Sequence, residues 1–379
     1  MTAVYRICTR CVMDTSDPEI SFDEAGVCNH CRNFEMVTSK RWFPNDEGTR
    51  LLEQKIDEIK AAGSNAEYDC IIGLSGGVDS SYLALKAKDW GLRPLVIHID
   101  AGWNSELAVS NIESIVKACN YDLHTIVIDW EEMRDLQLSY LKSGLSNQDV
   151  PQDHAFFANL YVYAVRNKIK YILSGGNLAT EGVFPTSWHG DAMDAINLKA
   201  VQRRFGTRKL RSYQMISFLE YYAIYPFIYG LRTVRPLNFM QYDKEQAIVA
   251  LSSIGWRPYG RKHGESRFTK LFQNYYLPEK FGYDKRRPHL SSLIVSGQMT
   301  RDNALAALNE PLYDSKDLAA DLAFFCKKLG VSENEFHSYM NEPNRHYTDF
   351  ANWDGRRKLI KSLQGIYARL RGKNINVYS

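Results

Sequence analysis

The chain has 379 residues, of which 45% are hydrophobic and 24% charged, and its formal net charge is +3. These values are typical of a globular protein with one large domain or two to three smaller ones, and the weak charge argues against bulk nucleic-acid binding. We expect a cytoplasmic protein without a membrane segment, because the sequence has no long apolar run and Met1–Arg6 lacks the apolar core of a signal peptide.

Four of the seven cysteines lie within the first 31 residues. They form two C-x₂-C pairs, Cys8 with Cys11 and Cys28 with Cys31. This spacing predicts a closed, structural zinc site in a ribbon-like segment that is too short to fold around a core of its own. An iron–sulfur cluster or a redox pair is the alternative, and His30 is a weaker candidate ligand.

The middle of the chain alternates helical and strand patterns after a helix expected over Glu47–Ala62. Continuous apolar strands separated by helices predict an α/β fold with a doubly wound parallel sheet. The expected strands are 69–74, 94–100, 124–129 and 171–176, and the expected helices between them are 80–90, 105–119 and 154–167.

The segment from Glu181 to Arg235 is rich in aromatic and basic residues, and we expect it to lie over the strand ends as helices and loops. Val234–Leu237 is interpreted as a short edge segment, and the chain beyond Tyr259 as mostly helical. The expected division is residues 1–40 for the cysteine segment, 41–258 for the nucleotide domain and 259–379 for a C-terminal region that completes the substrate site.

A glycine-rich loop, Ser75–Ser81 (Ser-Gly-Gly-Val-Asp-Ser-Ser), follows the first expected strand and opens a helix. Gly76 and Gly77 allow backbone N–H groups to surround an anion, and Ser80 and Ser81 are candidates to cap the helix. Asp79 beside a phosphate implies Mg²⁺. A turn that merely joins strand to helix is the alternative interpretation.

This loop resembles the SGGxDS motif of the PP-loop ATP pyrophosphatases, and it lacks the Gly-Lys ending of the Walker loop. The resemblance implies cleavage of ATP between the α and β phosphates, with Ser75, Gly76, Gly77, Ser80 and Ser81 on the pyrophosphate. It also implies that the strand ends at Asp100 and at Gly175-Gly176 border the nucleotide, although Asp100 alone suits a helix cap equally well.

A second motif begins at Gly255 and reads Gly-Trp-Arg-Pro-Tyr-Gly-Arg-Lys-His-Gly-Glu-Ser-Arg-Phe-Thr-Lys. By composition alone it suits a solvated, charged loop as well as a site for phosphates. Together with Phe281–Leu293 and the cysteine pairs, it is similar to the N-acetyl sugar amidotransferases of bacterial surface-polysaccharide synthesis. The resemblance implies that an acetamido group of a UDP-linked sugar, destined for lipopolysaccharide O-antigen, becomes an acetamidino group at the expense of ATP.

Roles in this chemistry are expected for three residues: Asp79 as a Mg²⁺ ligand, Lys262 on the pentavalent phosphorus, and Glu265 as a second Mg²⁺ ligand or as the base that deprotonates ammonium. We expect the negative charges of the UDP-sugar to be bound by Arg261, Arg267 and the basic cluster at 203–211.

Ammonia is expected from separate partners, because no segment resembles a glutaminase and residue 2 is Thr rather than Cys. The family resemblance implies a glutaminase and a barrel-shaped ammonia conduit, similar to the histidine-biosynthesis pair. Two rivals remain: a tRNA thiolase or lysidine-type PP-loop enzyme, and a binding or scaffold protein with a vestigial loop.

Overall fold

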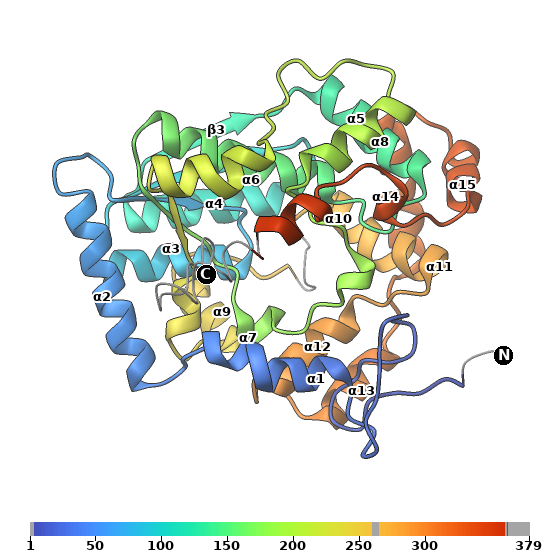
Figure 1. The fold of residues 1–379 in the computed structure, drawn as a ribbon, viewed down its shortest axis with the longest axis horizontal. Coiled ribbons are helices and arrows are strands. Elements are labelled where there is room, and N and C mark those ends of the chain that lie inside the picture. Colours follow the sequence, from blue (N-terminus) through green and yellow to red (C-terminus); the bar gives the residue numbers. More distant parts are fainter. Residues whose placement is uncertain (1–3, 260–264, 361, 363–379) are drawn as a thin grey trace.

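The computed structural model describes residues 4–259, 265–360 and 362. At its centre lies a parallel sheet of five strands in the order β3-β2-β1-β4-β5 (Figure 1). The strands are β1 (Cys70–Gly73), β2 (Pro94–Asp100), β3 (Leu123–Val127), β4 (Tyr171–Leu173) and β5 (Arg232–Val234). The expected doubly wound α/β fold is confirmed.

Successive residues of each central strand enter two different cores, as the period of two in a strand requires. Ile71 packs with α5, α6 and α8 on one face, whereas Cys70 and Ile72 pack with α2, α3 and α4 on the other. The covering helices are α2 (Asp46–Ala62), α3 (Val78–Asp89), α4 (Glu106–Cys119), α5 (Trp130–Ser143), α6 (Val150–Arg166), α8 (Ala195–Phe205) and α9 (Lys244–Ser252). Burial on both faces explains why β1, β2 and β4 are largely apolar, whereas the edge strand β3 is mostly exposed.

Two helices of this set, α5 and α9, were missed in the sequence. The predicted third strand ran to Asp129, but the strand stops at Val127 and Asp129 accepts a hydrogen bond from the backbone N–H of Glu132 at 2.9 Å. Asp129 therefore caps α5. The edge segment expected at Val234–Leu237 lies earlier in the chain, as β5. A 3₁₀ turn follows at Pro236, because proline cannot donate a hydrogen bond to a strand ladder.

The last third of the chain is helical, as expected, and most of it packs around a third core that contains Trp103, Phe268 and Phe325. The remaining helices are α1 (Asn29–Asn33), α7 (Leu178–Glu181), α10 (Arg267–Leu271), α11 (Leu277–Phe281), α12 (Arg286–Val295), α13 (Arg301–Asn309), α14 (Ser315–Leu329) and α15 (Glu333–Asn341). Short 3₁₀ or π segments are η1 (Phe34–Thr38), η2 (Ser39–Arg41), η3 (Thr186–Trp188), η4 (Glu220–Ile228), η5 (Pro236–Phe239), η6 (Phe272–Tyr276) and η7 (Tyr347–Asp349).

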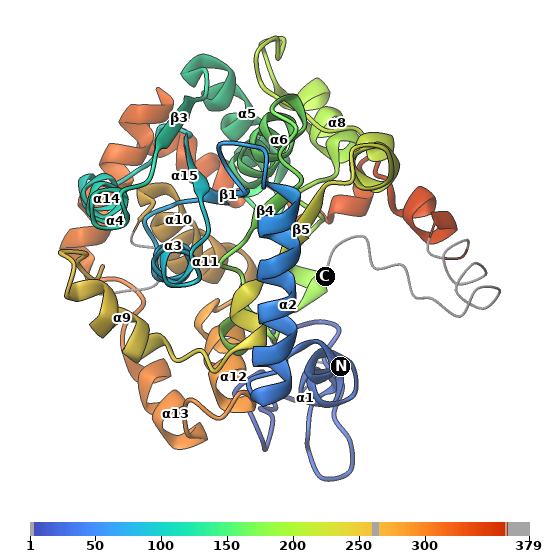
Figure 2. The same cartoon turned by 90° about the vertical axis from the view of Figure 1, so that its left-hand side faces the viewer.

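The N-terminal segment lies against α12 and α13, although more than 250 residues separate them in the sequence (Figures 1 and 2). The Arg301 guanidinium donates to the carbonyl oxygens of Cys8 and Cys11 at 2.9 to 3.2 Å, and the backbone N–H of Val12 donates to Ser291 Oγ at 3.2 Å. These bonds fix the cysteine segment to the C-terminal helices. Within the described part of the chain, no helix has the length and apolar character needed to cross a bilayer.

Candidate active site

The glycine-rich loop lies where the order of strands reverses. It leaves the carboxyl end of β1, whose neighbours are β2 on one side and β4 on the other. Helix α3, which follows β1, lies on one face of the sheet, and α8, which follows β4, lies on the other, so a crevice opens between the adjacent strands β1 and β4. Open parallel sheets bind their ligands in this position, and the loop therefore occupies the expected place for a nucleotide.

The peptide at Gly76 has a conformation and surroundings that only glycine tolerates. Its φ is +82°, and an added Cβ would lie 2.7 Å from the carbonyl oxygen of Ala108. The Gly76 carbonyl accepts hydrogen bonds from Trp256 Nε1 at 2.9 Å and from the Tyr259 hydroxyl at 2.8 Å. These two donors, which come from the second sequence motif, fix the orientation of the loop. Neither was assigned a role in the sequence analysis, although both stand in the motif.

The serines of the loop divide into two groups. Ser75 Oγ lies 3.1 Å from Ser80 Oγ and accepts a hydrogen bond from the Gly77 N–H at 3.2 Å. These hydroxyls therefore take part in hydrogen bonds within the loop. Helix α3 begins at Val78 with Gly77 as its N-cap and no side-chain cap, so the expected capping by Ser80 and Ser81 is wrong.

Ser81 is fully buried, and its hydroxyl has no hydrogen-bond partner among the described residues. It does not line the cavity at the loop, because one further residue of α-helix turns a side chain by about 100°. The structure therefore separates Ser81 from the expected pyrophosphate ligands; Ser75, Gly77 and Ser80 line the cavity, whereas Gly76 does not.

A cavity of about 450 Å³ opens at the loop. Its other walls come from the end of β4, where Gly175 and Gly176 lie, and from apolar side chains of α6 such as Phe157 and Leu160. A Cβ at Gly175 would lie 2.7 Å from the backbone of Asp79 and Ser80, so glycine permits the close approach of β4 to the loop. One end of the cavity is thus polar backbone and the other is apolar.

Asp79 lines this cavity and accepts a hydrogen bond from the Tyr242 hydroxyl. Burial, followed by the neighbouring Asp79 carboxylate, raises the pKa of Tyr242 well above its usual value. Tyr242 therefore remains a protonated donor that orients the carboxylate. Tyr242 was not recognised in the sequence, because nothing near it in the chain marks it as a neighbour of the loop.

Asp100 is not among the residues that line the cavity. Its Oδ1 accepts from the Gly102 N–H at 2.8 Å and from Asn104 Nδ2 at 3.1 Å, which makes it the stabilising residue of a turn after β2. His98, two residues earlier in β2, lines the cavity instead. Its Nδ1 donates to the Leu74 carbonyl at 2.9 Å, and its Nε2 accepts from Asn104 Nδ2 at 2.9 Å.

Glu265 reaches the loop through backbone pairing between distant segments. Asn104 and Ser266 form an antiparallel bridge, and the Ser105 N–H donates to the Glu265 carbonyl at 2.8 Å. A Cβ built on Gly77 would lie 3.4 Å from Glu265 Oε1, so the carboxylate faces the loop. Its expected neighbours in the motif, Arg261 and Lys262, lie outside the described residues.

Two of the arginines assigned to the UDP-sugar, Arg267 and Arg208, pair with carboxylates of the protein. Arg267 forms an ion pair with Asp321 at 2.7 Å and lies over the Phe324 ring. In the 203–211 cluster, Arg208 pairs with Glu131 at 2.9 Å. Neither Arg267 nor the described arginines of the 203–211 cluster line the first cavity or a second one that adjoins it, so their expected contact with the sugar is not supported.

A second cavity of about 570 Å³ adjoins the first. The two share Phe156, Glu181 and Glu265 as walls. Its lining is mixed and includes carboxylates, side-chain amides, aromatic rings and the cations Arg235 and Lys285.

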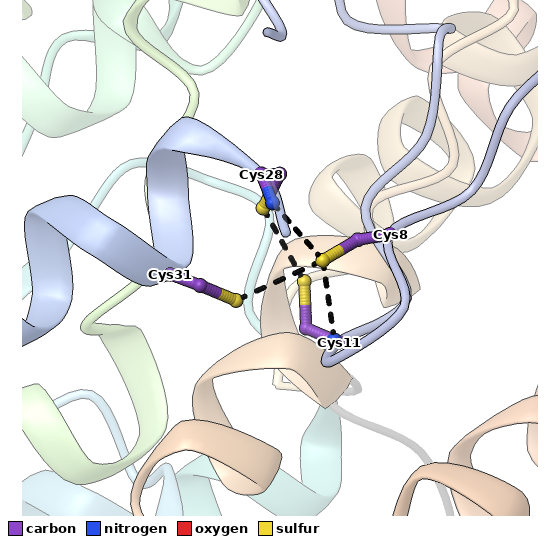
Figure 3. Close-up of side chains that lie close together, drawn as sticks. All are labelled: Cys8, Cys11, Cys28 and Cys31. Atoms are coloured by element: carbon purple, nitrogen blue, oxygen red, sulfur yellow. Dashed lines mark hydrogen bonds between the residues drawn. The ribbon is translucent and has the colours of Figure 1, made fainter. Parts of the chain in front are cut away.

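The four N-terminal cysteines form one compact cluster, and each is fully buried (Figure 3). All four Sγ atoms lie within 4.8 Å of one another, with Cys11 to Cys28 at 3.6 Å and Cys8 to Cys31 at 4.0 Å. Tetrahedral Zn–S bonds require sulfur–sulfur distances of about 3.8 Å, so the residues fit a closed metal site.

Backbone N–H groups of Arg10, Cys11 and Cys28 point at Cys8 Sγ from 3.3 to 3.4 Å and would support a thiolate there. His30 is not part of the cluster, because its Nε2 lies 2.6 Å from Asp17 Oδ2.

Comparison with known proteins gives one match to a family model. Residues 265–364 match the family model described as LPS biosynthesis protein WbpG-like, C-terminal domain. No curated protein sequence matches the chain significantly.

Among solved structures, NMN synthetase from Francisella tularensis is 16% identical over 77% of this chain and 95% of its own, with a TM-score of 0.35. The U34-tRNA thiolase NcsA from Methanococcus maripaludis, with its [4Fe-4S] cluster, is 14% identical over 70% of this chain and 82% of its own, with a TM-score of 0.33. NH3-dependent NAD synthetase from Campylobacter jejuni is 14% identical over 41% of this chain and 72% of its own, with a TM-score of 0.29.

These structural similarities are too low to support an argument about function. The sequence match is more specific, because it covers the segment that carries Glu265 and one wall of the second cavity. It supports the family suspected from the sequence: residues 265–364 are similar to the C-terminal domain of WbpG-like LPS biosynthesis proteins.

Proposed function

We propose that the chain is the synthetase subunit of an ATP-dependent amidotransferase that forms AMP and pyrophosphate. Its acceptor is the acetamido group of a UDP-linked N-acetyl sugar, whose oxygen is replaced by nitrogen to give an acetamidino sugar for bacterial surface polysaccharide. One observation carries the proposal: the glycine-rich loop and the family-matched segment meet at Glu265, on the wall between two adjoining cavities.

The first cavity suits ATP bound with its phosphates at the loop. The positive end of α3, which begins after its N-cap Gly77, favours negative charge, and the apolar end of the cavity near Phe157 suits a purine ring. Asp79 and Glu265 are the carboxylates that would hold Mg²⁺, which neutralises phosphate charge as pyrophosphate leaves.

The reaction has two steps. The amide oxygen attacks the α-phosphorus, and pyrophosphate leaves; the oxygen, a poor leaving group in the amide, thereby becomes part of AMP. Ammonia then attacks the imidate carbon, AMP leaves, and one proton must be removed. Glu265 faces the loop and is in position to accept that proton.

The cysteines outside the cluster argue against a tRNA-thiolating enzyme. Cys70, Cys119 and Cys326 are buried, and burial raises the pKa of each thiol, to about 11 in Cys326. Buried thiols of raised pKa are poor nucleophiles and sulfur carriers. The cluster of four cysteines leaves no open coordination position, so we assign it a structural Zn²⁺.

The direct test is to incubate the protein with ATP, Mg²⁺, ammonium and UDP-linked diacetamido sugars and to analyse the products by mass spectrometry. Replacement of oxygen by NH lowers the acceptor mass by about one unit, with AMP formed in equal amount. Formation of ADP, or no acceptor-dependent AMP, would contradict the proposal. With glutamine in place of ammonium, turnover should require a separate glutaminase and an ammonia-conducting barrel subunit.

A further inference from the structure

Three consecutive large apolar side chains are exposed where η4 ends. Phe227, Ile228 and Tyr229 have exposed fractions of 55%, 74% and 50%, and together they form an apolar tip on the surface. We propose that this apolar tip, with the cations around it, docks the protein on the surface of an anionic lipid bilayer. The inference goes beyond the proposed function and does not depend on it.

The apolar tip is fixed by the residues on both sides of it. Tyr225 and Leu231 are buried in the same core as Ile71, and the Leu231 N–H donates to the Tyr225 carbonyl at 2.9 Å. The Arg232 guanidinium donates to the Pro226 carbonyl at 2.6 Å. These bonds close the chain on either side of the tip, so its three side chains are held out toward the solvent.

Exposed cations surround the tip. Arg232 lies three residues beyond it, and the Arg232 N–H donates to the Lys170 carbonyl at 2.8 Å. Lys170 therefore lies beside the tip, and Lys168 precedes it by two residues. Arg166 lies close to Tyr225, because its charge acts on that hydroxyl, whose pKa burial raises to about 12. All four cations are exposed.

The charge around the tip is positive. Glu220, at the start of η4, also acts on the pKa of Tyr225, and its carboxylate accepts a hydrogen bond from the Ser217 N–H at 2.7 Å. The four exposed cations outnumber this carboxylate. Anionic headgroups attract such cations once they come within the Debye length, about 8 Å at physiological salt.

The size and composition of this surface favour a bilayer over a protein partner. A stable protein interface buries about 800 Å² on each partner and is depleted of lysine, whereas the tip offers three side chains among lysines and arginines. Apolar side chains that enter the headgroup boundary beside cations are typical of proteins that lie on a membrane surface. Tyrosine is also enriched where a bilayer meets water.

Docking through the tip leaves the candidate active site accessible. The strands β1, β4 and β5 are parallel, and the tip precedes β5, at the amino end of that strand. The glycine-rich loop follows the carboxyl end of β1. The tip and the loop therefore lie at opposite ends of the sheet, and the first cavity faces away from the bilayer.

The test is sedimentation of the full chain with vesicles of phosphatidylglycerol and phosphatidylcholine in equal parts, and with vesicles of phosphatidylcholine alone. We expect binding to the anionic vesicles, weakened by high salt. Ile228→Ser should weaken it at least about tenfold, since an apolar side chain no longer leaves water. The matched control is Val249→Ser, which changes a side chain of similar exposure, 72%, and should bind as the wild type does.

The double variant Lys168→Gln/Lys170→Gln tests the cations and should lose at least about tenfold on anionic vesicles, with Lys316→Gln as the control on another exposed lysine. Thermal denaturation would check that each variant remains folded. Absence of binding by the wild type, or equal binding by Ile228→Ser and Val249→Ser, would overturn the inference. A stoichiometric complex with another protein through the tip, without vesicle binding, would overturn it as well.

Discussion

The cysteine segment and the glycine-rich loop are both short motifs that can be recognised in the sequence, but they are stabilised in different ways. The loop is surrounded by the rest of the fold: β4 approaches it at Gly175, and Trp256 and Tyr242 hydrogen-bond to it from the second half of the chain. The cysteine segment shares a small core with Val183 and Trp188, and it depends on four sulfurs and on its contacts with α12 and α13. The loop should therefore respond to changes in packing, and the cysteine segment to loss of metal.

The largest expected effect is that of Cys28→Ala. Removing one of four ligands should abolish stoichiometric zinc and lower the free energy of unfolding by more than about 3 kcal/mol, because metal binding supplies the folding energy of such a segment. Metal analysis and thermal denaturation measure both quantities. Cys119→Ala is the control: this buried cysteine lies outside the cluster, and its loss should cost about 1 kcal/mol with zinc unchanged. Zinc retained in Cys28→Ala would remove the contrast between the two regions.

Gly175→Ala should damage the loop without affecting zinc. The new methyl group meets the backbone of Asp79 and Ser80 at 2.7 Å, and a shift of the loop by a fraction of an ångström should lower the rate of AMP formation about 100-fold. Gly355→Ala adds the same methyl group where nothing lies within 4 Å and should have no effect. Equal rates in the two variants would show that the approach of β4 is unimportant.

His154, in the core beneath the sheet, should make stability depend on pH. Burial lowers its pKa from 6.5 to about 4, so as pH falls below 6.5 the unfolded chain takes up the proton first and stability decreases until about pH 4. The shift corresponds to about 3 kcal/mol. Urea denaturation between pH 4 and 7.5 should show this slope in the wild type and in His337→Gln, an exposed control, but not in His154→Gln.

The smallest expected effect is that of Trp256→Phe, which removes one hydrogen bond to the Gly76 carbonyl while Tyr259 retains the other. We expect AMP formation to slow about five- to tenfold, the equivalent of roughly 1 kcal/mol. In the control Trp42→Phe the lost indole N–H has no partner among the described residues. A Trp256→Phe rate equal to that of the control would show that Tyr259 alone suffices to orient the loop.

Local patterns predicted most of the architecture and the two motifs. Apolar strands, the turn at Ser75–Gly77 and the C-x₂-C pairs are each encoded within a few residues, and all appear in the structure. Misassignments arose where the same local pattern is compatible with two structural roles. Asp129 was assigned to the end of a strand but caps a helix. Ser81 was assigned to the pyrophosphate together with Ser80, but its side chain is buried in the core.

Partners from distant segments could not be predicted. Tyr242 contacts Asp79 across 163 residues of sequence, and Lys285 contacts His189 across 96. Nothing local distinguishes these side chains from any other tyrosine or lysine, because their role depends on packing between elements rather than on a pattern within one. The second cavity, which is built from such contacts, was therefore visible only in the structure.

The bridge between Asn104 and Ser266 has a consequence for the order of synthesis. As the chain leaves the ribosome, the sheet and its loop emerge first, but Glu265 and the donors at Trp256 and Tyr259 arrive only later. The N-terminal cysteine segment gains its hydrogen bonds to Ser291 and Arg301 later still. A nascent chain thus carries a glycine-rich loop that lacks Glu265, and the proposed site becomes complete only in the last third of translation.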